Sequence, residues 1–193
     1  DPRASQIIDK LDCRYLTFGF SEDADIHPLE PSYGLSGTQV DLVTPKGVLP
    51  LFTPLIGRVN VYNLMAAVAS AQVCGMDLSL IGERVRGFGP VRGRLEMVTQ
   101  EPVSVMIDYA HTDDALRSML SSVKEVCKGR VILVFGAGGD RDKSKRPRMG
   151  SVAAALSDRV VLTNDNPRKE DPNEIARQVM GGFPPSFKSF SLE

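Results

Sequence analysis

The sequence has almost no excess charge and no long apolar stretch. It contains 23 lysines and arginines against 24 aspartates and glutamates, a formal net charge of −1. This balance argues against a generic nucleic-acid-binding protein, so any anion-binding site must come from local clusters. The apolar stretches are well short of the roughly 20 residues that a membrane span requires, and no signal peptide is visible. We expect a cytoplasmic protein with neither a membrane nor a nucleic-acid partner.

Cysteines are also scarce. Cys13, Cys74 and Cys127 are odd in number, far apart, and form no CxxC or metal-binding pattern. We expect buried, reduced thiols. An apolar share of 42% with 24% charged residues is typical of a globular protein, and 193 residues allow one ordinary domain or two small ones. The chain opens on "DPRAS" without an initiator methionine, which we interpret as part of something longer.

The first half of the chain predicts a mixed α/β unit. Residues 13–20, "CRYLTFGF", are rich in aromatic and branched residues and predict a strand. Residues 37–55 alternate like two strands joined at Pro45-Lys46-Gly47 in a hairpin. Residues 60–76 place apolar side chains on one helical face, with Gly75 as the C-cap. A glycine-rich loop at 87–93 follows, and we place a domain boundary near it.

The second half alternates strands and helices. The predicted strands are 103–110, which we expect to be buried, 130–136, which we expect to be covered on both faces, and 159–163. The predicted helices are 112–126 with Thr112 as N-cap, 146–157 with Pro147 at its first position, and 171–183 with a capping box from Asp171 to Glu174. This order indicates a parallel, doubly wound sheet, whose ligands collect at the carboxyl ends of the strands.

Polar clusters follow the predicted strands. In "FGAGGDRDKSKRPRMG" (135–150), Arg141 stands where a dinucleotide fingerprint needs its third glycine, and the segment is no P-loop either. What remains is a glycine loop with five cations at positions 141–148. It is either a solvated basic turn or an anion site that gains from charge and from a helix N-terminus.

Three further groups of residues each allow either a role in ligand binding or a purely structural role. Asp108 could hold Mg²⁺ directly or through water and His111 could contact a phosphate, or both belong to a helix-capping turn. Asn60 and Asn63 lie one helical turn apart, where amides can read a purine edge or cap a helix. Arg94 lies in a glycine-bracketed loop that suits a phosphate contact or an interdomain hinge.

The segment "VVLTNDNPRKEDPNE" (160–174) ends an apolar run with Asp165, Asn166, Pro167 and Arg168. Each residue has a backbone reason to be in a turn. Together they also suit a ligand that carries both a positive and a negative charge. On its own this segment is as consistent with a turn as with a site.

Five segments, taken together and in order, closely resemble the Mur ligase family: "GRVNVYNLMAA", "VRGRLE", "DYAHTDDALRSML", "VFGAGGDRDKSKRPRMG" and "TNDNPRKEDP". The match runs from "DPRA" to at least "NEIARQVMGG". The resemblance implies an α/β fold in which 1–94 form the C-terminal portion of the central ATP-binding domain. It assigns 95–193 to a truncated, Rossmann-like, mostly parallel C-terminal ligase domain.

The resemblance also implies ATP-dependent amide formation through an acyl phosphate, with Mg²⁺ as a further cofactor. Asn63, with Asn60, resembles the adenine-recognition pair, and Arg94 resembles the contact to the nucleotide phosphates at the hinge. Asp108 and His111 resemble residues that face those phosphates. No direct metal ligand is implied among these residues, with Asp108 as an indirect contact to Mg²⁺.

Asp165, Asn166, Pro167 and Arg168 match the D-N-P-R signature of the diaminopimelate-adding members, and Arg146 resembles a further contact to that substrate. The implied substrates are UDP-N-acetylmuramoyl-dipeptide and meso-diaminopimelate. Arg168 can bind the distal carboxylate in a bidentate fork while Asp165 or Asn166 takes the ammonium. Members that use lysine do not need this arginine.

The sequence departs from the family in what it does not contain. The family's P-loop, carbamylated lysine and UDP-sugar domain lie upstream of these motifs, and an "AGKGHE"-like segment lies downstream. We therefore expect these 193 residues not to ligate alone, and the full-length protein to be a monomer. The alternatives are a folylpolyglutamate or cyanophycin-type relative, a ligase-like structural subunit that has lost catalysis, and an NAD-binding module, which the missing third glycine disfavours.

Overall fold

The computed structural model describes residues 4–193, so the expected start of the family match at residues 1–3 lies outside the described residues. The chain forms two compact units. The first comprises residues up to Ser32, Gln39–Thr53 and Asn60–Phe88, and the second comprises Tyr33–Thr38, Pro54–Val59 and Gly89–Glu193. Each unit is described by itself.

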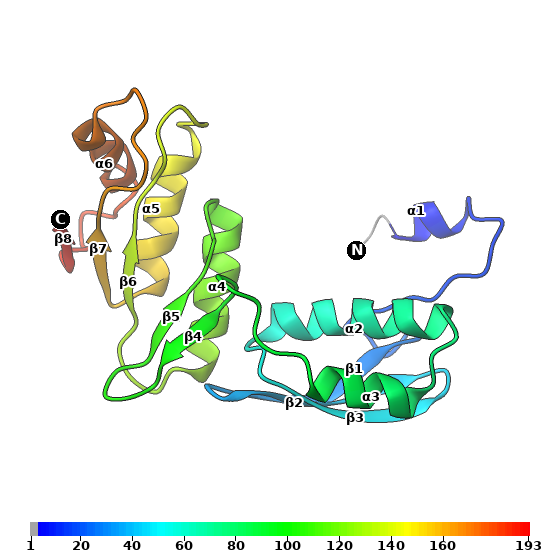
Figure 1. Ribbon diagram of the computed structural model, residues 1–193. Coiled ribbons are helices and arrows are strands. Elements are labelled where there is room, and N and C mark those ends of the chain that lie inside the picture. Colours follow the sequence, from blue (N-terminus) through cyan, green and yellow to red (C-terminus); the bar gives the residue numbers. More distant parts are fainter. Residues whose placement is uncertain (1–3) are drawn as a thin grey trace. The chain divides into compact units, whose positions relative to one another are not determined.

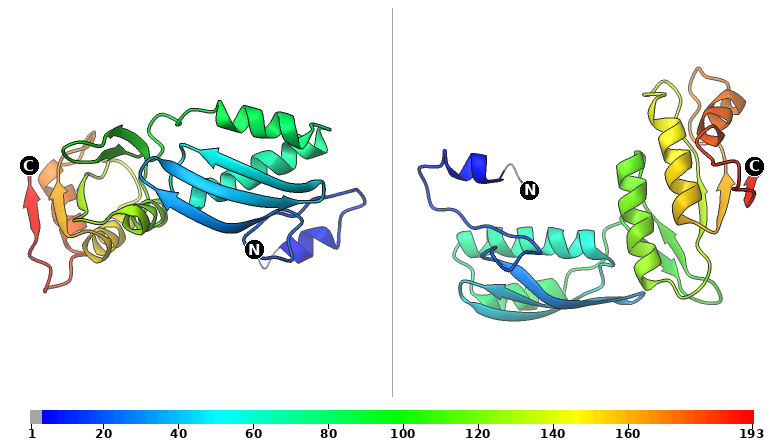
Figure 2. Two further views of the ribbon diagram at one scale, coloured as in Figure 1. Left: turned by 90° about the horizontal axis from the view of Figure 1, so that it is seen from below. Right: turned by 180° about the vertical axis from the view of Figure 1, so that it is seen from behind.

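The first unit holds most of a three-stranded sheet with helices on one face. The strands are β1 (His27–Gly34), β2 (Gly37–Thr44) and β3 (Gly47–Thr53), in the order β1-β2-β3. Helices α2 (Arg58–Val73) and α3 (Leu78–Arg86) lie along the sheet, and the short α1 (Ala4–Ile8) precedes it (Figures 1 and 2). Alternate residues of β2 and β3 are buried, as a half-covered sheet requires.

The sequence predicted part of this unit. The hairpin at Pro45-Lys46-Gly47 is confirmed, with Gly47 at φ 122°. The helix at 60–76 is confirmed, and Gly75 takes the left-handed φ of 84° beyond its end. The strand at 13–20 is wrong, because only an isolated bridge from Phe18 to Ile26 forms there. Strand β1 was missed, because its two prolines disguise it.

The second unit holds a parallel sheet in the order β6-β7-β8, formed by β6 (Ile132–Phe135), β7 (Arg159–Leu162) and β8 (Phe190–Leu192). Helices α4 (Asp113–Val126), α5 (Lys145–Leu156) and α6 (Pro172–Met180) pack against it (Figure 1). Residues of β6, β7 and all three helices form one apolar core. The predicted parallel α/β architecture of this half is confirmed.

The helix starts agree with the sequence in two of three cases. Thr112 caps α4 by accepting a hydrogen bond from the backbone N–H of Ala115 at 3.2 Å. Asp171 caps α6 by accepting from the backbone N–H of Asn173 at 2.9 Å, although Glu174 does not close a capping box. Helix α5 begins at Lys145, so Pro147 lies in its first turn rather than at its first position.

The burial predicted for two strands of this unit is wrong. The strand expected at 103–110 is the short β5 (Val105–Ile107), which pairs antiparallel with β4 (Glu96–Thr99) and exposes Val105 and Ile107. Strand β6 is covered on one face only among the described residues, because Ile132 is 53% exposed and Val134 61% exposed. An apolar run alone does not tell how many faces of a strand are covered.

The cysteines differ from expectation as well. Cys13 and Cys74 are exposed and Cys127 is half-buried, although all three are free thiols. Among residues 4–193, no helix has both the length and the apolar character needed to cross a membrane.

Candidate functional site

Two loops at the carboxyl ends of β6 and β7 interlock through glycines. The backbone N–H of Gly139 donates to the carbonyl oxygen of Asn166 at 2.9 Å. A Cβ on Gly136 would overlap the carbonyl oxygen of Thr163, and one on Gly139 would overlap that of Pro167. The glycine loop after β6 therefore gives the loop after β7 a surface on which its backbone lies directly. We call these glycines and their neighbours, residues 136–140, the glycine platform.

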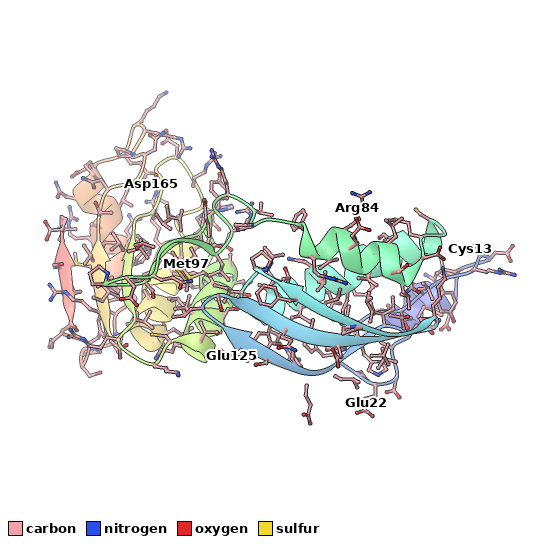
Figure 3. All side chains as sticks on the ribbon, turned by 60° about the horizontal axis from the view of Figure 1, so that its bottom comes forward. Cys13, Glu22, Arg84, Met97, Glu125 and Asp165 are labelled. Carbon is pink, nitrogen blue, oxygen red and sulfur yellow. The ribbon has the colours of Figure 1, made fainter. Side chains whose placement is uncertain are left out.

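The D-N-P-R turn lies on this platform with its functional side chains exposed. Asp165, Asn166 and Arg168 are exposed, while Pro167 is half-buried. Figure 3 shows Asp165 in the loop beyond β7. The side-chain oxygen of Asn166 accepts from the backbone N–H of Arg168 at 3.2 Å, which closes an Asx-turn. The residues predicted for a site therefore form a regular turn whose side chains are exposed.

Arg168 has an unusual backbone for a residue with a Cβ. Its φ is 50°, in the left-handed region that most side chains avoid. Its Nη1 donates to the carbonyl oxygen of Gly139. A Cβ on Gly138 would lie 3.1 Å from that Nη1 and 3.5 Å from Oδ2 of Asp165, so both side chains lie over this glycine. A guanidinium and a carboxylate are presented side by side.

A small pocket lies beside the turn. Its polar wall is formed by the segment from Thr163 to Pro167, and its apolar wall comes from β6, β7 and α6. The apolar lining residues are Ala137, Leu162, Ile175, Ala176 and Val179. The pocket has an internal volume of about 10 Å³, room for roughly one water molecule, and its apolar lining residues belong to the buried core, so it does not accommodate an amino-acid ligand.

Arg146, expected at the substrate, is placed beneath the loops instead. It is 0% exposed, and its guanidinium donates to both carboxylate oxygens of Glu170 at 2.9 Å. It also donates to the side-chain oxygen of Gln178 at 2.7 Å and to the carbonyl oxygen of Gly138 at 3.1 Å. The hydrogen bonds from Arg146 hold the pKa of the Glu170 carboxyl far below its usual range. In this arrangement Arg146 contacts the loops that carry the turn.

Most of the five cations predicted at 141–148 have protein partners. Lys143 pairs with Glu170 at 3.0 Å, Arg148 pairs with Asp113 at 3.1 Å, and Lys145 donates to the carbonyl oxygen of His111 at 2.8 Å. Among the described residues, Arg141 is exposed and makes no ion pair. It is the cation of this loop that is available to a ligand.

Asp108, His111 and Arg94 lie together in the second unit. The two carboxylate oxygens of Asp108 accept from the backbone N–H groups of Leu95 at 2.9 Å and Ala110 at 2.8 Å. The guanidinium carbon of Arg94 lies 5.1 Å from the ring centroid of Tyr109, a cation–π contact. Tyr109 in turn meets the ring of His111 edge-on at 5.1 Å. Asp108 therefore fixes the loop, and the ring of Tyr109 contacts both Arg94 and His111.

The imidazole of His111 has a defined tautomer. Its Nδ1 lies 3.0 Å from the carbonyl oxygen of Tyr109, and because a carbonyl only accepts, Nδ1 carries the proton. In the neutral ring this leaves Nε2 as an acceptor, and in the protonated ring it becomes a second donor. His111 is exposed, so Nε2 is the ring nitrogen open to a ligand.

Asn60 lies in the first turn of α2 and Asn63 in the second, and both belong to the first unit. Asn60 is buried, and Asn63 is exposed and donates to the side-chain oxygen of Asn60 at 3.4 Å. The predicted amide pair therefore exists. Asn63 is the exposed member of the pair.

The donor groups do not fit a directly bound metal. Across residues 4–193, no group of three or more histidine, cysteine, aspartate or glutamate side chains could hold one. Asp108 already accepts two backbone hydrogen bonds, which use two of the roughly four acceptor positions of its carboxylate. No chemical step is therefore derived from a metal held by these residues.

A parallel α/β sheet with interlocked loops at its carboxyl end defines the class of protein, and comparison with known proteins gives the family. The sequence profile described as the Mur ligase middle domain matches residues 1–71, and that of the Mur ligase glutamate ligase domain matches 93–191. The chain belongs to the Mur ligase family.

Individual relatives agree with this. A UDP-N-acetylmuramoyl-L-alanyl-D-glutamate–2,6-diaminopimelate ligase of Gloeobacter violaceus is 44% identical over 170 residues, which cover 87% of this chain and 35% of the relative. The same-named ligase of Bacillus velezensis is 40% identical over 184 residues, covering 94% and 38%. The chain thus spans little more than a third of the length of these relatives.

A solved structure of such a diaminopimelate ligase matches 100% of this chain and 41% of its own length, with a TM-score of 0.66 and 33% identity. The similarity therefore includes both units and the turn that carries Arg168.

Proposed function

We propose that these residues belong to an ATP-dependent ligase of peptidoglycan-precursor synthesis. This ligase adds meso-diaminopimelate to UDP-N-acetylmuramoyl-L-alanyl-D-glutamate. The observation that carries the proposal is the exposed turn from Asp165 to Arg168, mounted on the glycine platform. The named activity of the relatives supports it.

The chemistry of the turn matches diaminopimelate. The distal end of this amino acid carries a carboxylate and an ammonium. The guanidinium of Arg168 offers a planar pair of donors for the carboxylate. Asp165 supplies an acceptor with negative charge for the ammonium, and Asn166 supplies a carbonyl oxygen.

We assign Arg146 a different part from the direct contact that the sequence suggested. The guanidinium of Arg146 makes four protein hydrogen bonds, and its remaining donor, Nε, is buried without a partner, so burial keeps substrate away from it. We propose that Arg146 supports the turn from below. Arg141, exposed and without an ion pair on the same loop, is the cation that we expect to approach the substrate.

We assign Arg94 and His111 to the phosphates of ATP, and Asn63, held by Asn60, to adenine. When bound, ATP would supply its γ-phosphoryl group to the substrate carboxylate with release of ADP, and the amine would then displace inorganic phosphate to form the amide. Phosphoryl transfer depends mainly on positioning and on neutralised charge, which Arg94 and His111 can supply. Asp108 positions the loop that carries them, and Mg²⁺ would meet it only through water.

The 193 residues include only part of what the reaction needs, since they span little more than a third of the relatives. We propose that the isolated chain does not turn over, and that the full-length ligase is a cytoplasmic monomer. A coupled phosphate-release assay on the isolated chain with ATP and both substrates tests the first point. Turnover above a no-enzyme control would contradict it.

The substrate assignment is tested in the full-length ligase that contains these residues. Phosphate release is measured with meso-diaminopimelate and with L-lysine as the amine. The proposal predicts a much higher kcat/KM with diaminopimelate. Equal use of the two amines would refute the assigned specificity, and no amine-dependent turnover would refute ligase activity.

A further inference from the structure

Glu170 is the residue on which the two interlocked loops converge. Its carboxylate accepts four hydrogen bonds or ion pairs, and its side chain is only 12% exposed. Two come from Arg146 at 2.9 Å, one from Lys143 at 3.0 Å, and one from the backbone N–H of Asp140 at 2.6 Å. Because a carboxylate has about four acceptor positions, Glu170 is fully engaged.

These bonds join distant parts of the chain at one point. Asp140 and Lys143 belong to the loop after β6, whereas Arg146 lies in the first turn of α5. The backbone N–H of Glu170 donates to the carbonyl oxygen of Pro167 at 3.0 Å, so its own main chain closes the turn that carries Arg168. A displacement of Glu170 would therefore move both the glycine platform and the turn.

Arg168 depends on this closure more than an ordinary surface residue would. Its left-handed backbone conformation costs energy, and such a conformation persists only where its surroundings hold it. The interactions that hold it are the Asx-turn of Asn166, the hydrogen bond from its own guanidinium to the carbonyl oxygen of Gly139, the contact of Pro167 with Gly139, and the four bonds to the Glu170 carboxylate, which we call the clamp. Of these, the clamp is the one that pairs a carboxylate with two cationic side chains.

We propose that Glu170 is a positioning residue for substrate selection: held by Arg146, it fixes the turn so that Arg168 and Asp165 present a matched pair of charges. This inference rests on the proposed function, since the substrate is a zwitterionic amino-acid end. Glu170 itself contacts no substrate. Its loss leaves the binding groups present but displaced.

The decisive variant is Glu170→Gln, which keeps the shape of the side chain. A glutamine turns one acceptor oxygen into an NH₂ donor that would face the donors of Arg146, Lys143 or Asp140. The matched control is Glu174→Gln on α6. Glu174 lies in an exposed i,i+3 ion pair with Arg177, and its replacement keeps an acceptor for Gln178. Surface pairs of this kind contribute little to stability.

A second variant protects the test against misfolding. The double change Arg146→Met with Glu170→Met removes both charges, so no buried charge is left unpaired. If Glu170→Gln alone unfolds, this double variant gives the measurement. Thermal unfolding of each variant sets the temperature at which all of them are folded.

The experiment measures kcat, KM for diaminopimelate, KM for ATP and the preference for diaminopimelate over lysine, in the full-length ligase. Glu170→Gln or the double variant is expected to raise KM for diaminopimelate roughly tenfold to a hundredfold, as displacement of about an ångström can do. The preference over lysine should fall by a similar factor. KM for ATP and all values for Glu174→Gln should stay at wild type.

Each of the other possible results would overturn the proposal. A lowered melting temperature with unchanged KM and preference would make Glu170 merely structural and overturn the proposal. A parallel loss of kcat, KM for ATP and KM for diaminopimelate would indicate general damage and overturn it too. A wild-type ligase without preference for diaminopimelate would overturn the proposed function first, and this inference with it.

Discussion

Gly139 lies directly beneath the carbonyl oxygen of Pro167, so close that a Cβ at this position would overlap that oxygen. The glycine loop after β6 resembles a phosphate-binding loop in composition. In the structure its glycines serve close packing of one loop backbone on another. The two loops therefore form a single rigid support for the turn that carries Arg168.

Gly139→Ala should destabilise the second unit strongly. The methyl group would meet a backbone oxygen that cannot rotate away, and overpacking of this kind costs roughly 1–3 kcal/mol or more. The control is Gly129→Ala, whose Cβ would meet nothing within 4 Å. Chemical unfolding should show a loss for the first variant and a change within about 0.5 kcal/mol for the second. Equal stabilities would show that the loops are not in contact.

Replacing Arg168 with glycine should separate stability from binding. Because φ at this position is 50°, glycine should make the folded chain about 1 kcal/mol more stable than alanine does. Both variants should lose affinity for diaminopimelate, because both lack the guanidinium. Denaturant unfolding and the KM for diaminopimelate check the two halves. An Arg168→Gly variant less stable than Arg168→Ala would contradict the left-handed backbone.

Sequence predicted the parts of this fold that depend on local chemistry. The caps Thr112 and Asp171 mark helix starts because their side chains bond to nearby backbone N–H groups. The hairpin at 45–47 followed from the turn preference of its glycine. Strand β5 was expected in the parallel sheet, because a short apolar run does not reveal its pairing partner.

The site was predicted only in part for a similar reason. The turn from Asp165 to Arg168 was found because its residue types are adjacent in sequence. Arg146 was expected to be at the substrate, because sequence shows its charge but not its burial. Glu170 was missed, because a glutamate beside a lysine in a loop gives no signal until Arg146 is seen to lie against it.

Acid should weaken the clamp at Glu170. The pKa of this carboxyl is lowered in the folded chain by Arg146 first and Lys143 second, below an unfolded value near 4.3. A depressed folded pKa stabilises the fold above the unfolded pKa, and that stability is lost as pH falls through the folded pKa. The difference in melting temperature between wild type and Glu170→Gln should therefore be full at pH 7 and shrink below about pH 4. A difference independent of pH would contradict a charged clamp.

Replacing Tyr109 should weaken ATP binding without affecting diaminopimelate binding. Its ring aligns Arg94, and an exposed cation–π contact contributes roughly 0.5–1 kcal/mol, which corresponds to about a two- to fivefold change. Tyr109→Ala in the full-length ligase should raise KM for ATP by that factor without changing KM for diaminopimelate. Tyr109→Phe keeps the ring and should behave like wild type. A large effect of the phenylalanine variant would point to the hydroxyl instead.

The most direct test of the central claim is the KM for meso-diaminopimelate of Arg168→Ala in the full-length ligase, measured beside its KM for ATP. Loss of a bidentate, charge-assisted contact should weaken binding by roughly 1.5–3 kcal/mol, or about tenfold to more than a hundredfold. The account predicts a rise of that size in KM for diaminopimelate, with KM for ATP unchanged. An unchanged KM for diaminopimelate would contradict the assignment of the D-N-P-R turn as the substrate-selecting site.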